Sequence, residues 1–369
     1  MNQLDKGLFF AFIGLTLFGL VMMSSMSVAG SFEITGRNDY YFLRHMMYIV
    51  MGVPIFLIAF KFPYETLRKI SPVLFIFAIT LLLLVLVIGQ DFGTAAKSWL
   101  KVGPLSFQPT EVAKLAIVIF LAAVYSSGKN DVDTLQGGFM PFMFILGIPA
   151  LLIMAQPDFG SLMVISTVAG VMYFVAGANL KHYLGGICAA VLGATLVILT
   201  NPYIAKRFAV FMNPELDPLG AGFQVKQGLI AIGSGGWFGR GFQNSIQKFD
   251  YLPEVQSDTI FSAIAEELGF IRILCLLGIY FYIAHRGFFI ARNAPDQFTQ
   301  LLALGLTTWI VGQALINIAV NLALFPNTGI TLPLLSYGGT SLWASFAAFG
   351  ILLHISGNMK TTTRRRYMF

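Results

Sequence analysis

The stretch ISPVLFIFAITLLLLVLVIG, at residues 70–89, decides the fold of this chain. It holds twenty residues without a charge, about the number that a helix needs to cross the hydrocarbon core of a bilayer. The whole chain of 369 residues is 57% hydrophobic and 11% charged, whereas a soluble domain is about 25% charged. Charge this sparse cannot coat a water-soluble surface, so the sequence predicts an all-α integral membrane protein.

Other apolar runs of similar character predict about ten transmembrane helices in a single polytopic domain, residues 1–369. The ten runs are residues 8–29, 43–60, 70–89, 112–125, 141–155, 160–177, 183–200, 260–284, 298–324 and 341–355. If the N-terminus is cytoplasmic, the segments on the cytoplasmic side carry twelve Lys and Arg residues, and the short loops on the outer side carry four. Because positive residues favour the cytoplasmic side, we expect both termini to be cytoplasmic.

A large extracytoplasmic loop, residues 201–259, separates the seventh and eighth predicted spans. Its middle reads GFQVKQGLIAIGSGGWFGRGF, at 222–242, with four glycines between positions 233 and 239. Irregular backbone is tolerated at membrane depth only where it is buried in protein or lines a wet cavity. The pattern therefore predicts a re-entrant or interfacial segment beside a cavity. In a smaller stretch, residues 90–108, Trp99 lies between Lys97 and Lys101, a mixture that suits the lipid headgroup level.

Acidic residues gather around the start of the eighth predicted span. Asp258 stands directly before it, in PEVQSDTIF, and Glu266 and Glu267 follow about two turns later. Asp is a favoured helix N-cap, but ionisable residues inside membrane spans are usually functional. A helix cap and a catalytic base both fit the position of Asp258. Arg272, in the same span, has Glu266 or Glu267 as its natural partner.

Charged and polar residues near three other span ends each leave two interpretations open. Glu111 and Lys114 are i, i+3 neighbours that can pair on one helix face. Lys114 either extends outward from a membrane-edge ion pair or faces the bundle interior and offers its charge to a phosphate or to Asp258. Asp158, in the QPDFG turn, is a turn and cap residue or a site residue. Ser336, in the SYGG turn, belongs either to a shaped turn or to a substrate site.

Several classes of function lack their sequence signals in this chain. There is no GxxxxGK[ST] loop, HExxH motif or GxSxG elbow, and the four histidines have no ligand spacing. We therefore predict no metal site built on protein ligands. The absence of a dense basic patch argues against nucleic-acid binding. Cys188 and Cys275 lie in apolar runs and are expected to be buried, inert thiols.

Four segments in order along the chain carry a family resemblance. They are KSWLKVGPLSFQPTEVAKL at 97–115, GLIAIGSGGWFGRGF at 228–242, QKFDYLPEVQSDTIFSAIAEELGF at 247–270 and NTGITLPLLSYGGTSL at 327–342. Together they resemble the FtsW/RodA (SEDS) family of peptidoglycan polymerases, and the last two favour its division branch over its elongation branch. The resemblance implies a multi-pass enzyme of the bacterial cytoplasmic membrane that polymerises lipid II. It also implies a class B penicillin-binding protein as transpeptidase partner, together with other division or elongation proteins.

The resemblance assigns roles to particular residues. Asp258 matches the essential outer-loop aspartate of the family, and Glu111, Lys114 and Asp158 match ionisable positions around its central cavity. Two positions depart from the family pattern. Gln256 and Ser257 stand where the family often has His followed by Thr or Asn. Ser98 stands where it often has Arg, which would move a phosphate contact to Lys97 or Lys101.

These residues suggest a mechanism. Asp258 would be the base for the acceptor sugar hydroxyl, and Lys97, Lys101, Lys114 or a divalent cation (Mg²⁺ or Mn²⁺) would offset the charge of the departing diphosphate. A single catalytic carboxylate predicts inverting transfer. The residues expected to bind substrate are Lys97, Lys101, Glu111, Lys114, Asp158, Glu254 and Ser336.

A transporter is the alternative function, for example a flippase for a lipid-linked precursor. Spans interrupted by Gly and Pro, with charges near a central cavity, are equally typical of carriers. Carriers, however, place their charges near the membrane midplane. Here Asp258, Lys97, Lys101, Glu111 and Asp158 are all predicted at the outer ends of spans, which favours the enzyme.

Overall fold

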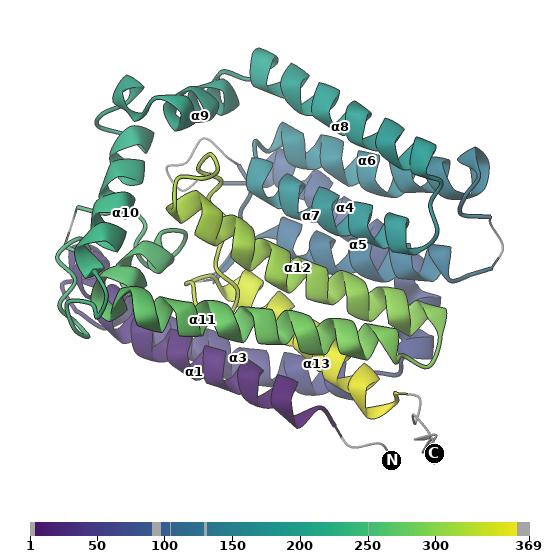
Figure 1. Cartoon of the computed structure of the whole chain (residues 1–369), viewed down its shortest axis with the longest axis horizontal. Helices are drawn as coiled ribbons and strands as arrows, with labels where there is room; N and C mark the ends of the chain where they lie inside the picture. Colours follow the sequence, from purple (N-terminus) through teal and green to yellow (C-terminus); the bar gives the residue numbers. More distant parts are fainter. Residues whose placement is uncertain (1–3, 91–96, 104, 129–130, 250, 360–369) are drawn as a thin grey trace, which may run out of the picture.

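The computed structural model describes residues 4–90, 97–103, 105–128, 131–249 and 251–359, and it is almost entirely helical (Figure 1). The main helices are α1 (Lys6–Met26), α2 (Val28–Thr35), α3 (Tyr40–Lys61), α4 (Tyr64–Ile88), α5 (Pro109–Tyr125), α6 (Met140–Ala155), α7 (Phe159–Val175), α8 (Leu180–Thr200), α9 (Pro202–Met212), α10 (Ala221–Gly235), α11 (Ile260–Arg292), α12 (Gln297–Asn321) and α13 (Gly339–Gly357). Two short turns of helix are η1 (Leu135–Phe139), a π-helix that runs into α6, and η2 (Pro214–Leu216). A small antiparallel hairpin pairs β1 (Leu100–Val102) with β2 (Leu105–Phe107), with Leu100 opposite Phe107.

Each of the ten predicted apolar runs falls largely on one long helix, namely α1, α3, α4, α5, α6, α7, α8, α11, α12 and α13. Seven helical segments in the described part of the chain are long and apolar enough to cross a bilayer, and α7 is a shorter apolar helix. The all-α membrane fold is therefore confirmed, while the number of crossings stays a prediction.

The bundle has a central layer and a lipid-facing periphery. We compared how much of the most apolar stretch of each helix is buried inside the protein. The buried share is 89% in α13 and 72% in α12, but only 6% in α8. Figure 1 shows α8 along one edge and α12 in the middle of the bundle. Cys188 on α8 and Cys275 on α11 are exposed. The prediction of buried thiols was wrong, because an apolar run does not tell which side of its helix faces lipid.

The start of α1 and the end of α13 meet at one end of the bundle. The backbone N–H of Asp5, before α1, donates to the hydroxyl of Ser356 near the end of α13, at 3.1 Å. Arg286 of α11 closes the same corner by pairing with Asp5 at 2.5 Å. This agrees with an even number of crossings.

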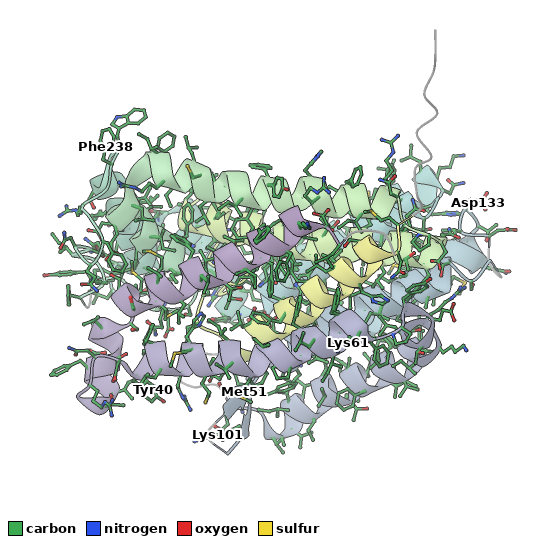
Figure 2. All side chains as sticks on the ribbon, turned by 90° about the horizontal axis from the view of Figure 1, so that it is seen from below. Tyr40, Met51, Lys61, Lys101, Asp133 and Phe238 are labelled. Atoms are coloured by element: carbon green, nitrogen blue, oxygen red, sulfur yellow. The ribbon has the colours of Figure 1, made fainter. Side chains whose placement is uncertain are left out.

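In Figure 2, each labelled loop residue lies toward one of the two ends of the bundle. Tyr40, Lys101 and Phe238, which the topology prediction places outside, lie toward the left of that view, and Lys61 and Asp133, predicted to lie inside, lie toward the right. The sides of the membrane to which these ends belong remain a prediction.

The glycine-rich part of the long loop packs backbone against backbone on α11. After α10 ends, the N–H groups of Arg240 and Gly241 donate to the carbonyls of Glu266 and Glu267, at 2.9 and 3.0 Å. Gly269 has φ +77° inside α11, and the main chain of Phe238 and Gly239 lies where its Cβ would be. The residues predicted as a re-entrant or interfacial segment thus form the ordinary helix α10 followed by a tightly docked glycine turn.

Candidate functional site

Asp258 lies in the turn that leads into α11, with its side chain half-buried. The first helical residue is Ile260 and the N-cap is Thr259, which makes no side-chain cap bond. From the side chains that the structure describes, the carboxylate accepts two long hydrogen bonds, from Gln224 Nε2 to Oδ2 at 3.5 Å and from Ser257 Oγ to Oδ1 at 3.4 Å. Good hydrogen bonds to an ionised oxygen are several tenths of an ångström shorter. The helix-cap interpretation of Asp258 is therefore wrong, and its oxygens retain capacity to accept a proton.

The main chain of Asp258 is held more firmly than its side chain. Two asparagines of α12, one helical turn apart, both donate to its carbonyl oxygen: Asn317 Nδ2 and Asn321 Nδ2, each at 2.9 Å. Asn317 also donates to the carbonyl of Ile330 at 2.8 Å, and Asn321 accepts from Ser262 Oγ at 2.8 Å. A buried amide pair thus fixes the position of the aspartate backbone. The sequence analysis missed both asparagines, although polar residues inside a predicted span are a signal for them.

The charge around Asp258 favours its neutral form. Burial and the negative charge of Glu254 raise the pKa of Asp258 to about 7, while Arg207 and the hydrogen bond from Gln224 act in the opposite direction. A carboxyl with this pKa is about half ionised at neutral pH, where a general base is most effective. Strongly shifted carboxyls of this kind are concentrated at functional sites.

Glu254 joins the site through a serine. Ser257 Oγ lies 3.0 Å from Glu254 Oε2 and 3.4 Å from Asp258 Oδ1, so one hydroxyl lies between the two carboxylates. Glu254 itself is exposed and has φ +54°. A non-glycine residue in this region costs about 1–3 kcal/mol, and such strain is frequent at functional sites. The structure therefore brings two sequence-predicted site residues together.

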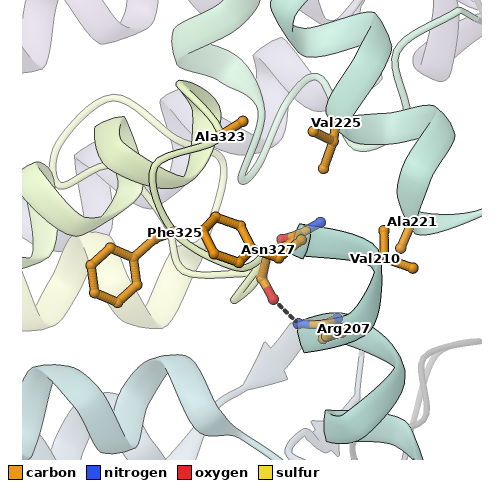
Figure 3. Close-up of a pocket in the computed structure, with 8 residues that line it drawn as sticks. Arg207, Val210, Ala221, Val225, Ala323, Phe325 and Asn327 are labelled. Atoms are coloured by element: carbon orange, nitrogen blue, oxygen red, sulfur yellow. Dashed lines mark hydrogen bonds between the residues drawn. The ribbon is translucent and has the colours of Figure 1, made fainter. Parts of the chain in front are cut away.

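Arg207 of α9 is a site residue that the sequence analysis did not single out. Its guanidinium donates to the carbonyl of Asn327 at 2.8 Å and to the hydroxyl of Tyr203. Figure 3 shows Arg207 beneath Asn327 in a small pocket that Val210, Ala221, Val225 and Phe325 also line. The signal for it was a cation near the start of the long outer loop.

Glu111 and Lys114 form an ion pair at 2.8 Å, and their side chains are only 4% and 2% exposed. Lys114 Nζ also donates to Gln313 Oε1 of α12 at 2.7 Å. Gln313 in turn donates to the carbonyl of Thr331 at 3.0 Å. The membrane-edge interpretation of Lys114 was wrong, since the bundle buries it completely. The pair connects α5 and α12 to the loop of residues 327–338.

The other predicted site residues have structural contacts. Asp158 is the N-cap of α7, with Oδ1 accepting from Ser161 N at 3.0 Å, and its Oδ2 lies 3.3 Å from Gln108 Nε2. Ser336 is buried and its hydroxyl accepts from Leu332 N at 2.7 Å, which closes the turn. Lys97 and Lys101 are exposed on and beside the β1–β2 hairpin, and Lys101 projects from the edge of the bundle in Figure 2.

The two glutamates of α11 belong to a separate buried network. Glu266 accepts from Ser245 Oγ at 2.5 Å and pairs with Arg240 at 3.4 Å, and Glu267 pairs with Lys248 at 3.0 Å. Arg272 instead donates to the carbonyls of Phe238 and Leu268, at 2.6 and 3.0 Å. The predicted Arg272–Glu pair was wrong, because the long loop folds back and brings its own cations to the glutamates.

A comparison with known protein families identifies the family of this chain. The family described as cell cycle proteins, FtsW/RodA/SpoVE, matches residues 6–361. The chain belongs to this family. A relative from Idiomarina loihiensis, named probable peptidoglycan glycosyltransferase FtsW, is 37% identical over 98% of this chain and 89% of its own. Stage V sporulation protein E of Bacillus subtilis (strain 168) is 39% identical over 92% of this chain and 93% of its own.

Solved structures of the family share the whole fold. A chain from a peptidoglycan synthase complex, described as coordinating polymerization and crosslinking, is 27% identical, covers 97% of this chain and 99% of its own, and superposes with a TM-score of 0.81. The rod shape determining protein RodA of Thermus thermophilus is 26% identical, covers 100% and 99%, and has a TM-score of 0.71. The family resemblance inferred from the four segments is confirmed.

Proposed function

We propose that this chain is a peptidoglycan glycosyltransferase of cell division that polymerises lipid II at the outer face of the bacterial cytoplasmic membrane. The observation that supports it most is Asp258, a carboxyl with a pKa of about 7 whose hydrogen bonds from the described side chains are long. The relatives named for this activity support the reaction class.

The reaction is a single displacement. The acceptor sugar hydroxyl gives its proton to Asp258 as its oxygen bonds to the anomeric carbon of the donor sugar. At the same time the bond from that carbon to the lipid diphosphate breaks, and the diphosphate leaves with the bonding electron pair. Attack from the face opposite the leaving group inverts the configuration at the anomeric carbon. The proton on Asp258 is then lost to water.

Cations must offset the charge of the departing diphosphate. Lys97 and Lys101 are exposed and available for this role. Lys114 is already neutralised by Glu111, so we assign it to holding the site together. A divalent cation (Mg²⁺ or Mn²⁺) that accompanies the substrate diphosphate would supply the remaining positive charge. Glu254, Asp158 and Ser336 would shape the substrate site.

A transpeptidase would act on the polymer as it forms. The structural relative comes from a complex that coordinates polymerization and crosslinking, which supports a class B penicillin-binding protein as the partner here. Both termini would lie in the cytoplasm and the chemistry outside.

Purified protein with labelled lipid II, with and without that transpeptidase, tests the proposal by the length of the glycan chains. We expect polymer, and inverted linkages in it. Transfer of labelled lipid II across vesicles without any polymer would instead support the flippase.

A further inference from the structure

Three amide groups in a row lead to the carboxylate of Asp258. The backbone N–H of Gly329 donates to Asn327 Oδ1 at 3.2 Å, and Asn327 Nδ2 donates to Gln224 Oε1 at 2.6 Å. Gln224 Nε2 then faces Asp258 Oδ2 at 3.5 Å. The three side chains come from the 327–338 loop, from α10 and from the turn before α11, which are far apart in the sequence.

Each link in this row dictates the orientation of the next. A side-chain amide can present either its oxygen or its nitrogen to a neighbour. A backbone N–H can only donate, so Gly329 requires the oxygen of Asn327 and turns the Asn327 nitrogen toward Gln224. The Asn327 nitrogen can only donate too, so it takes the Gln224 oxygen and leaves the Gln224 nitrogen pointing at Asp258.

The row is anchored from the side. Arg207 donates to the main-chain carbonyl of Asn327 at 2.8 Å, which ties the start of the 327–338 loop to α9 (Figure 3). Gln224 lies in the first turn of α10, where Ala221 N is held by Asp217 Oδ2 at 3.0 Å. Both amides therefore have fixed backbones and are held by each other.

We propose that Gln224 and Asn327 are positioning residues, which deliver one fixed N–H donor to Asp258 and so hold its carboxylate ready for the acceptor hydroxyl. The inference rests on the proposed function, in which Asp258 is the base. Neither amide needs to touch the substrate, and Asn327 acts only through Gln224.

The proton affinity of Asp258 follows from the same contacts. Glu254, in its own turn, opposes ionisation, whereas Arg207 of α9 and Gln224 of α10 favour it. Lys226, two residues after Gln224 on α10, is paired with Glu215. A donor to the ionised form lowers the pKa of a carboxyl. Removal of the Gln224 amide should raise the pKa of Asp258, so that a higher pH is needed to ionise the base.

The test is the pH profile of lipid II polymerisation by the full-length protein. Gln224→Met keeps the length of the side chain and removes the donor, and we expect the midpoint of the profile to rise by about half a pH unit. Turnover at pH 7 should fall about two- to threefold, and it should recover at pH 8.5. A purely structural loss would not recover with pH.

The second variant is Asn327→Ala, which frees Gln224 to rotate and should move the midpoint in the same direction. The double variant should behave like Gln224→Met alone, because both act through one donor. Gln227→Met, half-buried on the same helix, is the matched control and should keep the wild-type profile. Melting curves accompany each variant.

An unchanged midpoint in Gln224→Met, or additive shifts in the double variant, would overturn the positioning role. Failure of the proposed function looks different. In that case the wild-type protein would make no polymer, or Asp258→Asn would polymerise at the wild-type rate, whatever the amide variants do.

Discussion

At the scale of single residues, Asp258 combines a firmly held backbone with a lightly bonded side chain. Asn317 and Asn321 fix its carbonyl, while the hydrogen bonds that its carboxylate accepts from the described side chains are long. That division of roles suits a base, which must stay in place and still accept a proton.

Asp258→Asn should insert and melt like the wild type, bind lipid II and make almost no polymer. An amide cannot take the proton, and the loss of one positioned base typically costs about 10²–10⁴ in rate. Asp258→Glu should retain little activity as well, because an extra methylene displaces the carboxylate by about an ångström. Polymerisation rates with labelled lipid II measure both. Near-normal polymer from Asp258→Asn would move the base to Glu254, Glu266 or Glu267.

Glu254→Gln should move the pH profile of polymerisation toward acid. The negative charge of Glu254 raises the pKa of Asp258, so its removal lowers that pKa and the base ionises at a lower pH. Gln shares the length of Glu and has no better access to φ +54°, so backbone strain is matched. An alkaline shift in the measured profile would contradict this electrostatic account.

At the scale of elements, the glycines at the end of α10 are the positions where an added side chain is most constrained. A Cβ at Gly235 would clash with the carbonyl oxygen of Ala265 on α11, and Gly236 has φ +53°. By contrast, no atom of the residues that the structure describes lies within 4 Å of a Cβ at Gly233, whose φ is also ordinary. The same helix end thus holds both constrained and free glycines.

Gly235→Leu or Gly236→Leu should therefore impair polymerisation more than Leu229→Ala, an exposed position on α10. Gly233→Leu is the sharper control, since it adds the same side chain two residues earlier into open space. Activity and thermal melting of the four purified variants decide the matter. Equal tolerance at all four positions would mean that the docked turn is a plain flexible loop.

At the scale of the whole molecule, the loop of residues 327–338 connects the separate polar networks. It reaches Lys114 through Gln313, the backbone of Asp258 through Asn317, and Gln224 through Asn327. The long loop of residues 201–259 closes over the same end of the bundle (Figure 1). The site is therefore built where the two loops meet, and the reaction side depends on the topology.

A cysteine in place of Asn244, in the long loop, should react with an impermeant thiol reagent added to intact cells. Asn244 is exposed, and the predicted topology places it outside. Cys188 and Cys275 are exposed on their helices, so both should first be replaced by Ala to remove background labelling. Labelling only after lysis would reverse the topology and with it the proposed side of the reaction.

The sequence by itself determined the class of protein, the ten helical segments and the family. These follow from local composition: an uncharged run of about twenty residues has few stable forms other than a helix in lipid. The Glu111–Lys114 pair and the cap role of Asp158 were also readable, since each depends on neighbours within a few residues.

Only the tertiary structure decided what lies around these residues. The burial of Lys114, the partners of Glu266 and Glu267, and the amides that hold Asp258 join residues up to 199 positions apart, as Lys114 and Gln313 are. Hydropathy measures how apolar a helix is, but it does not tell which side of that helix faces lipid and which faces another helix. Contacts between distant polar groups depend on how the helices pack, and the free energy of that packing belongs to the whole bundle rather than to any one segment.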